Sequence, residues 1–151
     1  MVHILVVRDQ LELVAYLRIA MAILSCFSEY IGHSYSYVAE ALAIRKALVI
    51  GSSKQLSHLM VESDNLGVIN MLKSQPEHIP WKIASIINDC HHLCSSFESM
   101  IFTHTMRQGN AVAYQLALFG SRNRLATIWD RAPPHVLFLS LYEYSCGISF
   151  P

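Results

Sequence analysis

The stretch YVAEALAIRKALVIGSSKQLSHLMVESD, residues 37–64, decides the fold of this chain. Its first half repeats apolar residues at the spacing of one helix face, which predicts a helix over residues 37–50. That face consists of Tyr37, Ala41, Ile44 and Leu48. Gly51 stands where glycine commonly ends a helix, and residues 56–63 then predict a strand. A helix that leads into a strand is typical of α/β domains.

The rest of the chain continues this alternation of helices and strands. Residues 65–72 predict a short helix, and Pro80 stands where a further helix can begin without losing a hydrogen bond. Residues 100–106 predict a strand, and Asn110 is a good N-cap for a helix over residues 111–119. Strand–helix–strand units imply a partly parallel sheet with helices packed on it.

The N-terminal part contains two apolar runs on either side of a short polar turn. Residues 4–7 are β-branched or leucine, residues 8–10 (RDQ) form the turn, and residues 13–23 are again mostly apolar. This pattern predicts a hairpin, although a helix competes for the second run because Ala, Leu and Met are good helix formers. The predicted order is two strands, a helix, a strand, two helices, a strand and a helix.

Composition indicates the number of domains, the cellular location and whether long-range charge attracts the chain to nucleic acid. The chain has 151 residues, about one domain, and its formal net charge is zero. No long-range positive field draws it to nucleic acid, so any such contact has to be local. Four cysteines form no tight framework, which favours reduced thiols and a nuclear or cytoplasmic location. We expect no secretory leader, and the apolar run over residues 13–27 is short for a membrane span.

Two carboxylates stand where an α/β fold places functional groups. Glu40 is on the sheet-facing side of the first predicted helix, an unusual place for an acid, although acids also favour helix N-termini. Asp64 follows a predicted strand, where ligands gather, but it could equally cap the next helix. Glu62 lies about 6.6 Å back along the strand and is more typical of a solvated residue.

Other candidate groups have a structural reading beside the chemical one. Cys90 and Cys94 could begin a zinc site, but no second pair accompanies them and both lie on an apolar stripe, which favours packed core thiols. His104 could shuttle a proton or act as a ligand, yet a half-buried strand residue is the commoner role. The sequence has neither a phosphate-binding glycine loop nor a serine-hydrolase elbow.

Three segments, in this order, resemble the type 1 ribonuclease H-like domains of plant retroelement-derived proteins. They are residues 39–45 (AEALAIR), 61–64 (VESD) and 104–113 (HTMRQGNAVA). Residues 6–9 (VVRD) are similar to the second strand of that family and its turn. The resemblance implies a ribonuclease H-like domain over residues 2–124, and a C-terminal tail over residues 125–151.

The family resemblance implies a chemistry as well as a fold. The fold is a mixed five-stranded sheet flanked by helices, and the activity is hydrolysis of the RNA strand of RNA–DNA hybrids. Four carboxylates hold two magnesium ions, which stabilise the attacking water and the leaving oxygen. Glu40 and Asp64 match two of these carboxylates, as catalytic and metal-binding residues. His104, Arg107 and Asn110 match residues that support the site or contact the nucleic acid.

The chain departs from the family pattern at the other two acids. The last acid should follow Asn110 by four residues, but Tyr114 stands there, and a neutral tyrosine is a poor magnesium ligand. The first acid belongs to a first strand with an Asp-Gly motif, which the sequence lacks. The chain is therefore expected to start at the second strand, with Asp9 in a hairpin turn on the wrong element. We expect weak binding of one Mg²⁺ ion at best.

The expected loss of the first strand has a structural consequence. In the family this strand is central, so its loss would leave two neighbouring strands with unpaired backbone groups. Each buried unpaired group costs ~1–3 kcal/mol. We therefore expect a chain that is aggregation-prone, that depends on a protein partner to complete the sheet, or that is locally rearranged around residues 2–25.

Two functions follow from these observations. The first is a nucleic-acid-binding ribonuclease H-like domain that hydrolyses RNA–DNA hybrids with impaired activity. The second is a catalytically inactive binding or interaction remnant of a retroelement-derived gene. Incubation of a labelled hybrid with Mg²⁺ separates the two.

Overall fold

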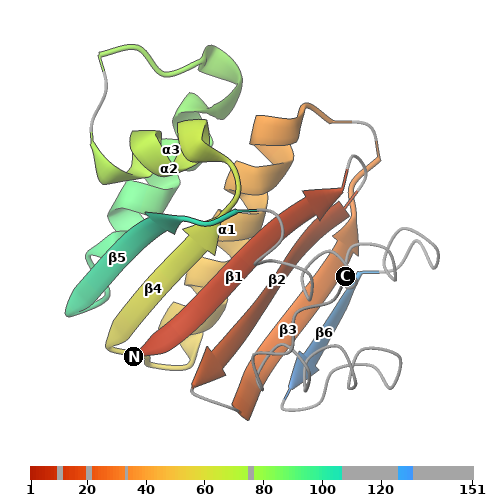
Figure 1. Cartoon of the computed structure of the whole chain (residues 1–151), viewed down its shortest axis with the longest axis vertical. Coiled ribbons are helices and arrows are strands. Elements are labelled where there is room, and N and C mark those ends of the chain that lie inside the picture. Colours follow the sequence, from red (N-terminus) through yellow and green to blue (C-terminus); the bar gives the residue numbers. More distant parts are fainter. Residues whose placement is uncertain (10–11, 20–21, 33, 75–76, 107–125, 131–151) are drawn as a thin grey trace.

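The computed structural model describes residues 1–9, 12–19, 22–32, 34–74, 77–106 and 126–130. These residues form one sheet with three helices behind it in the view of Figure 1. The strands are β1 (Val2–Asp9), β2 (Glu12–Ile19), β3 (Ala22–Tyr30), β4 (His58–Ser63), β5 (Ser99–His104) and β6 (Thr127–Asp130). The helices are α1 (Ser36–Ser53), α2 (Leu66–Lys73) and α3 (Trp81–Cys94).

The sheet has the strand order β5-β4-β1-β2-β3-β6 (Figure 1). β1 is central, because it pairs in parallel with β4 on one side and antiparallel with β2 on the other. The expectation of a missing first strand is therefore wrong, since residues 2–9 fill the position that was expected to be empty. Both neighbours of β1 have backbone partners, so the reason for expecting aggregation or a partner that completes the sheet disappears.

The second apolar run forms two strands, where the sequence predicted one strand or a helix. β2 ends at Ile19 and β3 begins at Ala22, and the two pair antiparallel with a register shift between Leu17 and Arg18. Pairing with β1 overrides the helix propensity of Ala, Leu and Met in this run. β6 falls in the stretch expected to be a tail and pairs antiparallel with β3. The described sheet thus has six strands, where the resemblance implied five.

The core lies between the sheet and the helices. α1 packs on β1, β2 and β4, and α3 packs on α1. β4 alternates buried and more exposed residues, as expected for a strand with one face against helices. The largest fully buried side chains are Phe27, Ile4, Leu17, Ile44, Leu48, Leu59, Ile69, Ile83 and Ile87. This core fixes the start of α1 against the end of β4, where the candidate site lies.

The end of α1 differs from the expectation that Gly51 terminates it. The helix continues to Ser53, and Gly51 is buried inside it. A Cβ atom at Gly51 would lie 3.1 Å from Leu59 Cδ1, so this glycine permits a close approach of helix and strand. The left-handed residue after the helix is instead Gln55, with φ of 56°. The Gln55 N–H donates to the Ser52 carbonyl, and the Leu56 N–H donates to the Gly51 carbonyl.

Gln55→Gly should stabilise the fold by about 0.5–1 kcal/mol. Glycine adopts the left-handed conformation without the strain that a side chain adds, and this gain exceeds the entropy cost of glycine in the unfolded chain. Chemical denaturation measures the free energy of unfolding. Gln55→Ala is the control, because it removes the side chain and keeps the strain; an equal gain in both variants would contradict the argument.

Candidate functional site

Glu40 lies in the second turn of α1 and is fully buried. Its carboxylate accepts a hydrogen bond from the hydroxyl of Ser63, the last residue of β4. The first turn of α1 contains no acidic residue, so attraction to the helix N-terminus does not explain Glu40. The structure therefore replaces that explanation with a buried contact between α1 and the end of β4.

Ser63 connects several elements at this end of the sheet. Its hydroxyl accepts a hydrogen bond from the Asn65 N–H at 3.1 Å while donating to Glu40. Its carbonyl accepts from the Thr105 N–H at 2.9 Å, just after β5. Sequence reasoning missed this residue, although a signal was present: Ser63 continues the inward-facing positions of Leu59 and Val61 as a polar residue.

Asp64 follows Ser63 directly, and the structure removes one reading of it. The N-cap of α2 is Asn65, whose Oδ1 accepts from the Val68 N–H at 3.1 Å. Capping of α2 by Asp64, the structural alternative, is therefore wrong. Asp64 is half-buried, and the His104 Nε2 lies 3.2 Å from its carbonyl oxygen. Glu40, Ser63, Asp64 and His104 thus meet where β4 and β5 end and α1 begins.

The central strand passes this group of residues without placing an acid beside it. Val6 of β1 pairs with Ser63 of β4. Asp9 ends β1, so it lies on the central strand, which corrects its assignment to the wrong element. It stands three residues past Val6, about 10 Å along the strand, and pairs with Glu12 at the hairpin. The position opposite Ser63 is apolar.

The remaining candidates fall into two groups. Arg107, Asn110 and Tyr114 lie outside the described residues. Glu62 is half-buried in β4, and its Oε1 lies 3.6 Å from the Nδ1 of His3. It alternates with the inward-facing residues of β4, so its side chain lies on the other face of the sheet from Ser63.

The cysteines of α3 behave as packed thiols. Cys90 is buried in the core, and burial raises the pKa of its thiol to about 12. Burial also raises the pKa of the Cys94 thiol. A raised pKa disfavours the thiolate that zinc needs. Within the described part of the chain, no three His, Cys, Asp or Glu side chains are grouped closely enough to hold a metal ion.

The donor groups at the Glu40 site do not fit a pair of magnesium ions. Two carboxylates, those of Glu40 and Asp64, come from the described residues near Ser63, and one oxygen of Glu40 already accepts the Ser63 hydroxyl. Magnesium requires near-octahedral oxygen coordination and holds its water tightly. Within the described residues, Glu40 and Asp64 therefore do not supply enough oxygen ligands to hold two magnesium ions.

Ser63→Ala should lower the free energy of unfolding by about 1–3 kcal/mol. The substitution leaves the buried carboxylate of Glu40 without its hydroxyl donor, and a lost bond to a charged group is costly. The same substitution in a Glu40→Gln background should cost less, because bonds to neutral amides are weaker. Denaturation of the four proteins gives the coupling. Equal costs in both backgrounds would show that the hydroxyl does not serve Glu40.

A comparison with models of protein families identifies the family of this chain. Residues 13–120 match the model of the family described as reverse transcriptase-like. No curated protein sequence gives a significant match.

Among the helices that the structure describes, none is long and apolar enough to cross a membrane.

Solved structures share the fold at low sequence identity. Ribonuclease H1 from the archaeon Halobacterium salinarum superposes with a TM-score of 0.72 at 19% identity, over 81% of this chain and 98% of that one. The N-terminal RNase H domain of Rv2228c from Mycobacterium tuberculosis gives 0.71 at 16% identity, over 82% and 96%. LC11-RNase H1 in complex with an RNA/DNA hybrid gives 0.66 at 18% identity, over 77% and 93%. The mixed α/β fold is therefore ribonuclease H-like.

Proposed function

Because this chain belongs to the reverse transcriptase-like family, we propose that it is a nucleic-acid-binding domain that hydrolyses RNA–DNA hybrids poorly. The hybrid is proposed as ligand because a structural neighbour was solved with an RNA/DNA hybrid bound. An origin in a plant retroelement and a nuclear or cytoplasmic location belong to the same proposal. They rest on the sequence pattern alone.

One observation carries the impaired hydrolysis. The edge where β4 and β5 end brings together Glu40, Ser63, Asp64 and His104, and the central strand opposite Ser63 contributes Val6 rather than an acid. The family normally uses divalent metals. A bound ion would supply the activation of water, and two carboxylates support weak binding of one Mg²⁺. The roles of Glu40 and Asp64 as its ligands are part of the proposal.

Hybrid binding and cleavage have to be measured separately. A fluorescently labelled RNA–DNA hybrid is first titrated with the full chain in EDTA, and its anisotropy reports binding. The same mixture is then given Mg²⁺, and gel electrophoresis reports cleavage. We expect binding that weakens as salt rises, because backbone phosphates dominate such contacts, together with slow cleavage.

The variants Glu40→Gln and Asp64→Asn test the site itself. Each should remove the residual cleavage and leave hybrid binding within about twofold, the shift expected when a lost interaction lies outside the binding contacts. Glu98→Gln is the matched control, because Glu98 is an exposed acid before β5. Absence of hybrid binding would overturn the proposal. Binding with no cleavage under any metal would favour the inactive remnant.

A further inference from the structure

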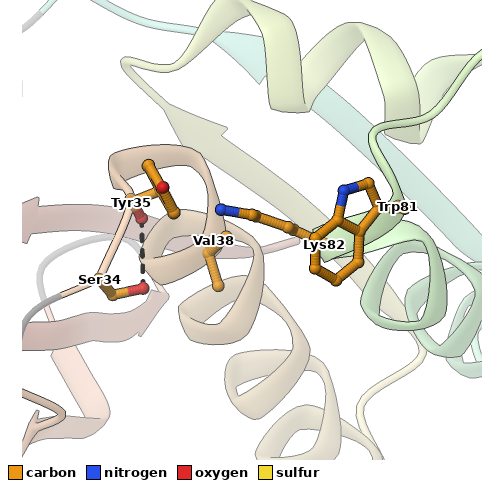
Figure 2. Close-up of a pocket in the computed structure, with 5 residues that line it drawn as sticks. All are labelled: Ser34, Tyr35, Val38, Trp81 and Lys82. Carbon is orange, nitrogen blue, oxygen red and sulfur yellow. Dashed lines mark hydrogen bonds between the residues drawn. The ribbon is translucent and has the colours of Figure 1, made fainter.

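A second feature lies between the starts of α1 and α3 (Figure 2). It is a pocket of about 470 Å³, a volume within the ~300–1,000 Å³ of ordinary ligand sites. Its lining residues are Ser34, Tyr35, Val38, Trp81 and Lys82. No motif in the sequence assigned a function to these residues, although Trp81-Lys82 places an aromatic ring beside a cation at a helix start.

The aromatic side chains of this pocket are exposed. The exposed fraction is 82% for Trp81 and 58% for Tyr35, and neither belongs to the core. Exposing a large aromatic ring to water has a high free-energy cost, so the exposure of these two rings needs a reason other than packing. A flat, exposed indole face is suited to stack on another flat ring.

The charge of the pocket favours an anion. The Lys82 Nζ lies 3.6 Å from the centroid of the Tyr35 ring and 5.6 Å from that of the Trp81 ring. Figure 2 shows the lysine reaching between these rings. The nearby Lys82 ammonium lowers the pKa of the Tyr35 hydroxyl. Among the described residues, none of the five that line the pocket is acidic, so none of them competes for Lys82 as a carboxylate.

We propose that this pocket binds an unpaired nucleotide of a single-stranded nucleic acid, with its base stacked on Trp81 and its phosphate beside Lys82. A ligand with a flat aromatic ring and a nearby negative charge matches both features. The bases of a hybrid duplex already stack on one another, so they offer no free face. The inference rests on the proposed function only in that the ligand is a nucleic acid.

The pocket and the Glu40 site are neighbours on the same helix. Val38 lines the pocket and Glu40, two residues later, turns toward the sheet and contacts Ser63. A single-stranded overhang could therefore occupy the pocket while the paired part of a hybrid lies at the end of β4. We therefore expect tighter binding of a hybrid with an unpaired end than of a blunt-ended hybrid.

Tryptophan fluorescence tests the pocket directly. Trp129 is the second tryptophan of the chain, so Trp129→Phe leaves Trp81 as the only reporter. The full chain with this substitution is titrated with oligo(dT) and oligo(rU). Stacking should quench the emission of Trp81, and the binding should weaken as salt rises. No quenching by either oligonucleotide would overturn the proposal.

Variants measured by anisotropy of a labelled oligo(dT) complete the test. Trp81→Ala should weaken binding by on the order of tenfold or more, and Trp81→Phe should restore most of it. Lys82→Gln should weaken binding and its salt dependence, whereas Lys73→Gln, on an exposed lysine of α2, should not. Thermal unfolding checks that each variant folds. Unchanged affinity in Trp81→Ala would overturn the assignment.

The outcomes also separate this pocket from the proposed function. Hybrid binding without single-strand binding would overturn the pocket and leave the proposed function standing. Single-strand binding that depends on Trp81, without any hybrid binding, would support the pocket and refute the hybrid as ligand. Quenching by an oligo-glutamate peptide but by neither oligonucleotide would overturn the proposal in favour of an acidic protein partner.

Discussion

The purified chain should cleave RNA–DNA hybrids at least about 10²–10³-fold more slowly than a ribonuclease H with all four acids. Loss of a single electrostatic group in an enzyme site commonly costs this much. We expect two groups to differ here, because Val6 pairs with Ser63 on the central strand and Tyr114 stands where the family resemblance implies the last acid. The losses need not add, since groups that act as a unit are not independent. Single-turnover cleavage of a labelled hybrid with Mg²⁺ gives the rate.

A repair experiment gives this expectation its sharpest test. Because β1 is present and pairs Val6 with Ser63, Val6→Asp would place a carboxylate across from the residue that binds Glu40. Tyr114→Asp alone should restore little, and the two substitutions together should restore Mg²⁺-dependent cleavage. Glu40→Ala in the repaired chain should then abolish it. Circular dichroism has to confirm folding, because Val6 is fully buried and a buried carboxylate is costly.

Two results would contradict this account of the site. One is cleavage by the unrepaired chain at an ordinary rate that Glu40→Ala leaves unchanged. The other is restored cleavage by Tyr114→Asp alone, which would mean that the central strand needs no acid. Leu17→Asp is the matched control, because it buries the same carboxylate on β2 without facing Ser63. It should give no cleavage.

Ile44→Ala should destabilise the domain by about 2–5 kcal/mol, the cost of removing a large buried aliphatic side chain. Ile44 is fully buried on the face of α1 that packs on the sheet and α3. The change is a large part of a domain's usual margin of ~5–15 kcal/mol. Chemical denaturation measures it, as a lower midpoint with an unchanged slope.

The matched control for Ile44→Ala lies on the same helix. Val49 is 50% exposed, so Val49→Ala should change the free energy of unfolding by less than about 0.5 kcal/mol. Similar losses in both variants would mean that α1 does not pack as the structure shows. If Ile44→Ala lowers the free energy of unfolding only slightly, the core has closed around the cavity that the substitution leaves.

Local patterns in the sequence determined the helices α1, α2 and α3 and the strands β4 and β5. Their apolar periodicity, Pro80 and the family resemblance of residues 39–113 are local properties, which is why the α/β class and the order of these elements were predictable. Glu40 and Asp64 were predicted as site residues for the same reason, since each stands at a recognisable position of a helix or strand. The periodicity also predicted correctly that Cys90 packs in the core.

Only the tertiary structure decided what β1 and Ser63 do. A strand's place in a sheet depends on which distant strand it pairs with, and the pairing of Val6 with Ser63 joins residues 57 positions apart. The sequence pattern therefore predicted that the first strand is missing, whereas in the structure residues 2–9 form the central strand β1. The burial of Glu40 is likewise explained only by the Ser63 hydroxyl, which donates a hydrogen bond to it. A buried carboxylate needs such a donor, and local sequence patterns do not reveal which residue supplies it. The pocket of Tyr35, Trp81 and Lys82 arises in the same way, since it forms only where the starts of α1 and α3 meet.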